Sequence, residues 1–272
     1  MRAGETVKPC FSTLGCPGWS VERVLQAIGE WGYEGIELRG LENEMSLPDS
    51  PHLAPGSTFL TRLAESGCDL VVLGSSASFA RTDAAEKECE AYVRLAAATG
   101  APIVRVFGGG LPEDASRQHA VELLAPSLRR MCDLAGAMGV TIGLETHDAW
   151  CRGDECALIL DAVDHPALGI VWDAHHSIRH GETPDQTLRA VGDRIIHVHL
   201  KDGFWQDGKA RYTLFGEGDL PLRQVLQCLK NAGYKGYLSL EWEKKWHPEL
   251  QGPEVAFPQY ASKLKEMLAD LK

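Results

Sequence analysis

Short apolar runs alternate with segments of helical spacing along the whole chain. Apolar residues three or four positions apart predict an amphipathic helix after each run, the last over Tyr260–Leu271. Such alternation is typical of parallel strands with right-handed crossovers, and eight units close into a barrel. We therefore expect one α/β domain over residues 1–272, a single (β/α)₈ TIM barrel. The predicted strands are Cys10–Leu14, Gly35–Leu38, Leu70–Gly74, Ile103–Phe107, Thr141–Glu145, Gly169–Asp173, Ile195–Leu200 and Tyr237–Glu241.

Glycine and serine support these boundaries. Ser20 stands where a helix N-cap is wanted. Two polar stretches, 42–55 and 75–81, are predicted as long loops at the functional end of the barrel. Helix ends are predicted at Gly32, Gly67, Gly100, Gly139 and Gly233.

Composition and charge narrow the class of protein. The 272 residues are 44% hydrophobic and 24% charged, which is ordinary for a globular enzyme. The formal net charge of −11 would repel a polyanion, so no nucleic-acid partner is expected. No run reaches the roughly 18 apolar residues that span a bilayer, and the N-terminus lacks the apolar core of a signal peptide. A cytoplasmic protein with no membrane partner is expected.

Eight cysteines are scattered along the chain without any C-x-x-C pair. A chain of this length does not depend on disulfides for stability. We expect buried free thiols without a chemical role.

The last four predicted strands each bring a metal-binding side chain to the same end of the barrel, where βα enzymes place their chemistry. Because alternate side chains face the interior, Glu145 shares a face with His147, and His199 with Lys201. Buried charges need partners, so the alternatives are a divalent metal site or internal salt bridges. Mainly oxygen ligands with one imidazole favour Mn²⁺ or Zn²⁺, with Mg²⁺ and Co²⁺ also open. The four candidate ligands are Glu145, Asp173, His199 and Glu241.

Five motifs in the C-terminal half resemble the xylose-isomerase-like superfamily of sugar phosphate isomerases and epimerases, which is related to family 2 AP endonucleases. The likeness extends from about the first strand to the last helix. The motifs are Gly143-Leu144-Glu145-Thr146-His147, Trp172-Asp173-Ala174-His175-His176, His197-Val198-His199-Leu200-Lys201-Asp202, Phe215-Gly216-Glu217-Gly218 and Ser239-Leu240-Glu241-Trp242-Glu243.

The resemblance implies roles for several of these residues. Glu145, Asp173, His199 and Glu241 match the four ligands of the family's single catalytic metal, and His176 matches its substrate-contacting histidine. In ketose epimerases of this family the first and last metal-binding glutamates also form the acid/base pair. Metal chelation of a carbonyl and its adjacent hydroxyl would stabilise an enediolate, leading to epimerisation, isomerisation or dehydration.

Other side chains are candidates for substrate contact. Lys201 is expected to stabilise an oxyanion as a catalytic residue or to pair with Asp202. His147 either lines the pocket or supports a ligand. Glu37 binds a polyol hydroxyl or pairs with Arg39. Further candidates are Trp205, whose ring could stack on a sugar, and Arg211, the arginine in the loop after the seventh strand.

The expected function is a metal-dependent isomerase or epimerase of a small polyhydroxylated carbonyl compound, with a homodimer as the expected assembly. The main alternative is a dehydratase of the inosose or dehydroshikimate type. An endonuclease-IV-like nuclease would need extra metal-binding histidines and a basic groove. The third alternative, a non-catalytic sugar-binding protein, does not explain the intact acid/base pair.

Overall fold

The computed structural model describes residues 7–206 and 208–271, which form two compact units. The terminal unit comprises the described residues up to Leu70 together with those from Val198 onward. The central unit is Val71–His197. Each unit contains four neighbouring parallel strands.

In the terminal unit the strand order is β7-β10-β1-β2. Leu238 pairs with Val198 and Ser239 with His199, which fixes the register of β10 against β7. Helix α1 packs against α2 and α9. The elements are β1 Lys8–Ser12, η1 Thr13–Gly15, α1 Val21–Trp31, β2 Gly35–Leu38, η2 Pro51–Leu53, α2 Thr58–Glu65, β7 Ile195–Leu200, β8 Asp202–Gln206, β9 Lys209–Thr213, α8 Leu222–Asn231, β10 Tyr237–Leu240 and α9 Pro253–Ala269.

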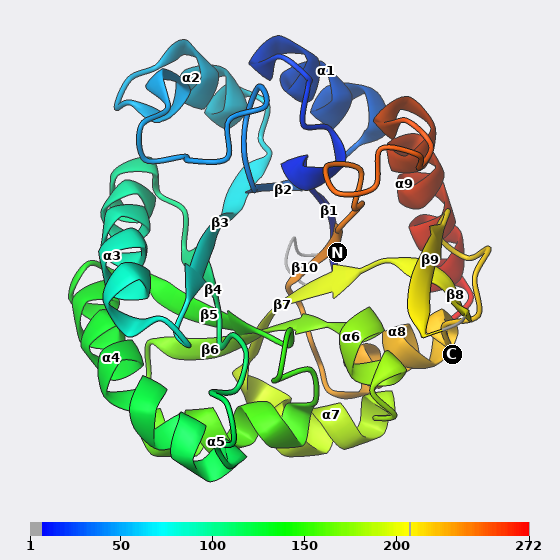
Figure 1. Cartoon of the computed structure of the whole chain (residues 1–272). Coiled ribbons are helices and arrows are strands. Elements are labelled where there is room, and N and C mark those ends of the chain that lie inside the picture. Colours follow the sequence, from blue (N-terminus) through cyan, green and yellow to red (C-terminus); the bar gives the residue numbers. More distant parts are fainter. Residues whose placement is uncertain (1–6, 207, 272) are drawn as a thin grey trace. The chain divides into compact units, whose positions relative to one another are not determined.

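In the central unit the strand order is β3-β4-β5-β6. Helices α3, α4 and α5 lie together on one side of these strands (Figure 1). Phe107 pairs with Glu145, so the ends of β4 and β5 are level, whereas Glu145 pairs with Val171 and β6 continues to Asp173. The elements are β3 Asp69–Ser78, α3 Thr82–Thr99, β4 Ile103–Phe107, α4 Arg117–Ala137, β5 Thr141–Glu145, α5 Gly153–Val163, β6 Leu168–Asp173, α6 Ala174–Arg179, α7 Pro184–Val191 and η3 Gly192–Arg194.

All eight strands predicted from the sequence are present, and β2, β4, β5 and β7 have the predicted bounds. The predicted helix signals are also confirmed. The Ser20 hydroxyl accepts a hydrogen bond from the Arg23 N–H, as an N-cap should. Gly32 and Gly100 end α1 and α3 in the left-handed conformation, with φ of 70° and 80°, which glycine adopts at no steric cost.

The first strand is Lys8–Ser12 rather than Cys10–Leu14, and two other predicted boundaries are wrong by more than two residues. Residues 75–78 are not loop but the end of β3, because the Ser75 hydroxyl bonds the Arg105 carbonyl at 2.6 Å and Ser78 pairs with Phe107. The last helix begins at Pro253, seven residues before Tyr260, with proline in its first turn, where no N–H is needed.

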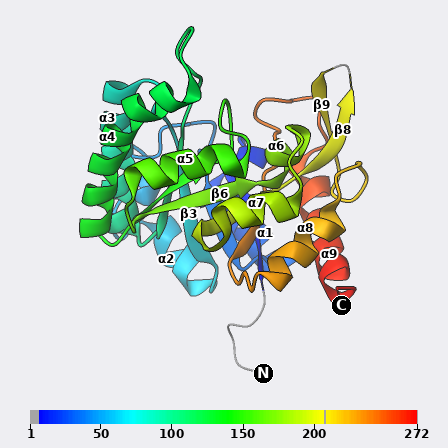
Figure 2. The same cartoon turned by 90° about the horizontal axis from the view of Figure 1, so that it is seen from below.

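An antiparallel hairpin, β8–β9, follows β7 where the sequence predicted only a loop. Figure 2 shows it beyond helices α8 and α9 of the same unit. Its ladder pairs Phe204 with Arg211 and Trp205 with Ala210. The hairpin therefore places Trp205 and Arg211, two candidates for substrate contact, on regular strands of the terminal unit.

All eight cysteines are free and buried, as predicted. Burial raises the pKa of Cys151 to about 12, so this thiol is protonated at neutral pH. In residues 7–206 and 208–271, no helix combines the length and apolarity that crossing a membrane requires.

Candidate metal centre

The four sequence-predicted metal ligands are all buried at strand ends. Asp173 and His199 have no exposed surface, while Glu145 and Glu241 are 1% and 5% exposed. Glu145 and Asp173 belong to the central unit, His199 and Glu241 to the terminal unit. Because the burial of an isolated carboxylate is very costly, the carboxylates in each unit need positive charge or hydrogen-bond donors nearby.

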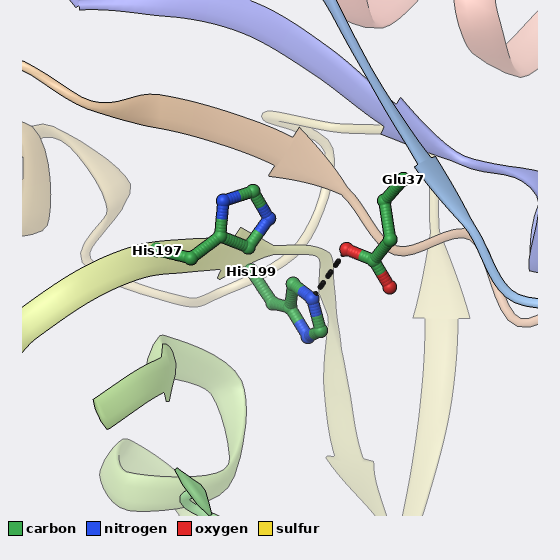
Figure 3. A group of neighbouring side chains, drawn as sticks. All are labelled: Glu37, His197 and His199. Carbon is green, nitrogen blue, oxygen red and sulfur yellow. Dashed lines mark hydrogen bonds and ion pairs between the residues drawn. The ribbon is translucent and has the colours of Figure 1, made fainter. Parts of the chain in front are cut away.

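In the terminal unit, His199 lies between two carboxylates. Its Nε2 atom is 2.8 Å from Oε2 of Glu37, a good hydrogen-bond distance (Figure 3). Its Nδ1 atom is 3.4 Å from Oε1 of Glu241, which is longer than a normal hydrogen bond. The imidazole therefore turns one nitrogen to a buried supporting carboxylate and the other to the predicted metal-binding carboxylate.

Lys201 occupies the other side of Glu241. Its ammonium nitrogen lies 2.5 Å from Oε2 of Glu241 and 2.6 Å from Oε1 of Glu243. The side chain is 1% exposed, so this is a buried ion-pair group rather than a surface contact. The sequence offered a Lys201–Asp202 pair as an alternative. In the structure Lys201 pairs with Glu241 and Glu243 instead, and the carboxylate of Asp202 accepts hydrogen bonds from backbone N–H groups.

In the central unit, Glu145 is paired with a buried arginine. Arg105 Nε is 3.1 Å from Glu145 Oε2, and both side chains are at most 2% exposed. Arg105 is held by the Ser75 carbonyl, 2.8 Å from Nη1, and its guanidinium lies 4.1 Å from the centre of the Phe107 ring. Sequence analysis did not single out Arg105. The available signal was a charged residue within the apolar run Ile103–Phe107.

Asp173 also begins α6. Its Oδ1 atom accepts the N–H groups of His175 and His176, at 2.9 and 3.1 Å. Its Oδ2 atom is 3.5 Å from Nε2 of His176. The D-x-x-H spacing therefore brings His176 to the metal-binding candidate itself, and the cap fixes the orientation of the carboxylate.

His147 is the more accessible histidine of this group. Its side chain is 35% exposed, and Nδ1 lies 3.0 Å from Oδ1 of Asp148. This contact with His147 lowers the pKa of the Asp148 carboxyl below its usual value. The His147 ring also contacts Phe107 and His176, each with centroids 4.7 Å apart. The ring is thus oriented on three sides.

The remaining predicted substrate contacts are not brought together on one surface. Glu37 is fully buried, and its carboxylate contacts His199. Trp205 is 45% exposed and Arg211 is also exposed. Because Arg211 is opposite Phe204 in the ladder, it points to the other face of the hairpin from Trp205. The hairpin cannot present both side chains to one ligand from the same face.

The Phe215–Gly218 motif forms a turn around Asp202. The carboxylate of Asp202 accepts N–H bonds from Gly203 at 2.8 Å and from Gly216 and Gly218 at 2.9 Å. An added Cβ at Gly218 would lie 2.2 Å from Asp202 Oδ1, so only glycine fits there. These backbone groups bind an internal carboxylate, as expected for a structural turn.

We expect Asp202→Asn to destabilise the protein by about 1–3 kcal/mol, the cost of buried groups left without a partner. The new NH₂ group would face either the Gly203 donor or the Gly216 and Gly218 donors. Urea unfolding measures the change, with Glu217→Gln, an exposed neutralisation in the same turn, as the control. Equal stability of the two variants would contradict this role of Asp202.

The donor set fits a divalent cation. Carboxylate oxygens with one imidazole nitrogen are the ligands that Mn²⁺ and Zn²⁺ take in proteins. Within the terminal unit, Nδ1 of His199 and Oε1 of Glu241 face each other at a distance that suits two ligands of one ion better than a direct hydrogen bond. The combination of carboxylate and imidazole ligands, rather than any single residue, supports the prediction of a divalent-metal site.

The chain belongs to the xylose isomerase-like TIM barrel family, whose family model matches residues 25–267. This match confirms the resemblance and the (β/α)₈ barrel predicted from the sequence. Structures of the same fold include the IOLI protein with a bound zinc atom (TM-score 0.79, 18% identity, 98% of this chain and 99% of that chain). Another is L-ribulose 3-epimerase (TM-score 0.78, 16% identity, 97% and 95% of the two chains).

Among curated proteins, inosose dehydratase of Geobacillus thermodenitrificans is 28% identical over 167 residues. The match covers 55% of this chain and 54% of the relative, so the chain spans about half the length of that enzyme. The curated relatives include dehydratases, whereas the epimerase structure shows likeness of fold alone.

Proposed function

We propose that this protein is a metal-dependent enzyme that removes the proton next to the carbonyl group of a small polyhydroxylated compound. The observation that carries the proposal is the buried set of three carboxylates and one imidazole at strand ends. Glu145, Asp173, His199 and Glu241 would hold one divalent cation, with Mn²⁺ or Zn²⁺ favoured. When bound, such a cation polarises a carbonyl oxygen and acidifies the neighbouring C–H bond.

The ion pairs within each unit bear on the roles of the two glutamates. Glu145 faces Arg105 at 3.1 Å, and Glu241 faces Lys201 at 2.5 Å. An opposite charge within about 4–6 Å favours the ionised form of a carboxylate. This suits both glutamates as ligands better than as the acid/base pair that the resemblance implies.

His147 is the proposed proton acceptor. A general base needs access to substrate and a fixed orientation. The ring is partly exposed, and the contact of its Nδ1 atom with Oδ1 of Asp148, at 3.0 Å, orients the imidazole. His176 would contact the substrate beside it, since the two rings are 4.7 Å apart.

A single oriented base favours dehydration over epimerisation. His147 would take the proton from the carbon next to the carbonyl, and a C=C bond would form as the C–O bond to the β-hydroxyl breaks. The proton held on His147 would then be returned to the departing hydroxyl, which leaves as water. The similarity to inosose dehydratase supports this outcome. The isomerase or epimerase expected first shares the proton-removal step and remains the second candidate.

The test is incubation of the protein, loaded with Mn²⁺ or Zn²⁺, with inosose, 3-dehydroshikimate and ketoses in deuterated water. Dehydration yields an unsaturated carbonyl product, whereas epimerisation yields a deuterated sugar without loss of water. His147→Gln is expected to lower turnover by about 10²–10⁴-fold, the usual contribution of a general base. C–H exchange that continues at the wild-type rate in the metal-loaded His147→Gln variant would contradict the role of His147 as the base.

A further inference from the structure

Glu37 joins four strands of the terminal unit through one buried carboxylate. On β2, it lies 2.8 Å from His199 of β7 through Oε2. The Ser12 hydroxyl of β1 donates to its Oε1 atom at 3.2 Å, and the Ser239 hydroxyl of β10 reaches Oε2 at 3.4 Å. The side chain is 0% exposed. Glu37 is thus fully surrounded by protein and has no free face for a substrate.

We infer that Glu37 is a positioning residue that fixes the tautomer of His199 and so presents Nδ1 as a metal ligand. A carboxylate accepts hydrogen bonds, so the 2.8 Å contact places the imidazole proton on Nε2. A neutral imidazole then carries its lone pair on Nδ1, the atom that faces Glu241. This inference rests on the proposed metal site and gives Glu37 a role other than the substrate contact expected from the sequence.

His197 suggests a competing interpretation of the same group. It lies two residues before His199 on β7, and one ligand atom from each of Glu37, His197 and His199 falls within 4.8 Å of the others (Figure 3). Three carboxylate or imidazole groups could hold a separate cation. Glu37, however, already accepts from Ser12, Ser239 and His199, which accounts for most of its lone pairs. The contacts therefore favour a supporting carboxylate over a second metal site.

Supporting carboxylates of this kind raise the basicity of a histidine ligand as well as orienting it. The isosteric Glu37→Gln can present an amide NH₂ to Nε2 in place of an oxygen. Such a donor would move the imidazole proton to Nδ1 and block the metal-binding lone pair. The substitution changes the supporting group while preserving its volume, so packing against Ser12 and Ser239 is largely retained.

The experiment combines two measurements on the full chain. Long-range ¹H–¹⁵N NMR of histidine-labelled, metal-free protein reads the His199 tautomer, with assignment by comparison with His199→Asn. Titration calorimetry with Mn²⁺ measures affinity. We expect the Nε2–H tautomer in the wild type, and about 10–100-fold weaker Mn²⁺ binding in Glu37→Gln. The matched control is Ser12→Ala, which removes a hydrogen bond to Glu37 but leaves the contact with His199, and should bind Mn²⁺ within threefold of the wild type.

The outcomes separate this inference from the proposed function. A wild-type His199 protonated on Nδ1, or Mn²⁺ affinity unchanged in Glu37→Gln, would overturn the role of Glu37 while leaving the metal site intact. Two Mn²⁺ ions per wild-type chain, with one lost in His197→Gln, would establish the second site instead. Absence of any Mn²⁺ binding by the wild type would refute the proposed metal site itself. The NMR tautomer does not depend on Glu37→Gln folding, so it remains decisive if that variant is unstable.

Discussion

Glu145→Gln is expected to abolish metal-dependent stabilisation of the protein. A cation present at 100 times its Kd stabilises a folded protein by about 2.7 kcal/mol, and the wild type should gain this amount from Mn²⁺ or Zn²⁺. Glutamine keeps one oxygen near Arg105 but removes the charge proposed to bind the cation. Affinity should fall by more than the roughly 100-fold that loss of a supporting group costs. Chemical unfolding with and without metal measures both quantities.

The matched control for this substitution is Glu182→Gln in the same unit. Glu182 is another buried carboxylate, 4% exposed, but it accepts from the Gly153 N–H and the Thr187 hydroxyl, each at 2.7 Å. It should lose stability without losing the increment due to metal. If Glu145→Gln retains the full increment, Glu145 is not a ligand and the proposed site is incorrect.

Lys201→Met is expected to destabilise the metal-free protein by about 3–5 kcal/mol, as is typical when one partner of a buried ion pair is removed. The carboxylates of Glu241 and Glu243 would both lose the Lys201 ammonium group as their ion-pair partner. Their side chains are only 6% and 13% exposed. Equilibrium urea unfolding measures the loss. Added Mn²⁺ should stabilise this variant more than it stabilises the wild type, because the bound ion would supply beside Glu241 the positive charge lost with the Lys201 ammonium.

A second substitution distinguishes the ion pair from a catalytic role. In Lys201→Met/Glu243→Gln, one of the two unbalanced charges is removed, so part of the stability should return. Glu243→Gln alone should cost less than Lys201→Met, because Lys201 keeps Glu241 at 2.5 Å. Lys201→Met with normal stability but greatly reduced turnover would instead support the oxyanion-stabilising role expected from the sequence.

The strands could be predicted closely because each is an apolar run with turn residues on both sides. The run Ile103–Phe107 has the bounds of β4 because its neighbours are small or turn-forming residues. The end of β3 was missed because residues 75–78 carry no apolar signal; their strand conformation depends on bonds to β4. Local composition predicts where a strand begins more readily than how far its partner extends it.

The alternation of inward and outward side chains along the strands correctly indicated that the candidate ligands are buried. It could not identify the side chains with which they form ion pairs or hydrogen bonds. Arg105 is distant in sequence from Glu145, and Glu37 is 162 residues from His199. Such contacts depend on strand register, which one sequence does not provide. The β8–β9 hairpin was missed for a related reason. Its strands are short and largely exposed, so cross-strand hydrogen bonds define it more than apolar periodicity.

The closure of the Phe215–Gly218 turn on Asp202 makes the base of the β8–β9 hairpin independent of its tip. Gly203 and Gly218 donate to the same carboxylate, so we expect that residues at the hairpin tip, beyond the Phe204–Arg211 pair, can be exchanged without moving the end of β7. Longer or shorter tips could be grafted onto the hairpin while the bonds from Gly203 and Gly218 to Asp202 are kept. This offers a route to new ligand preferences without substitution of His199 or Lys201.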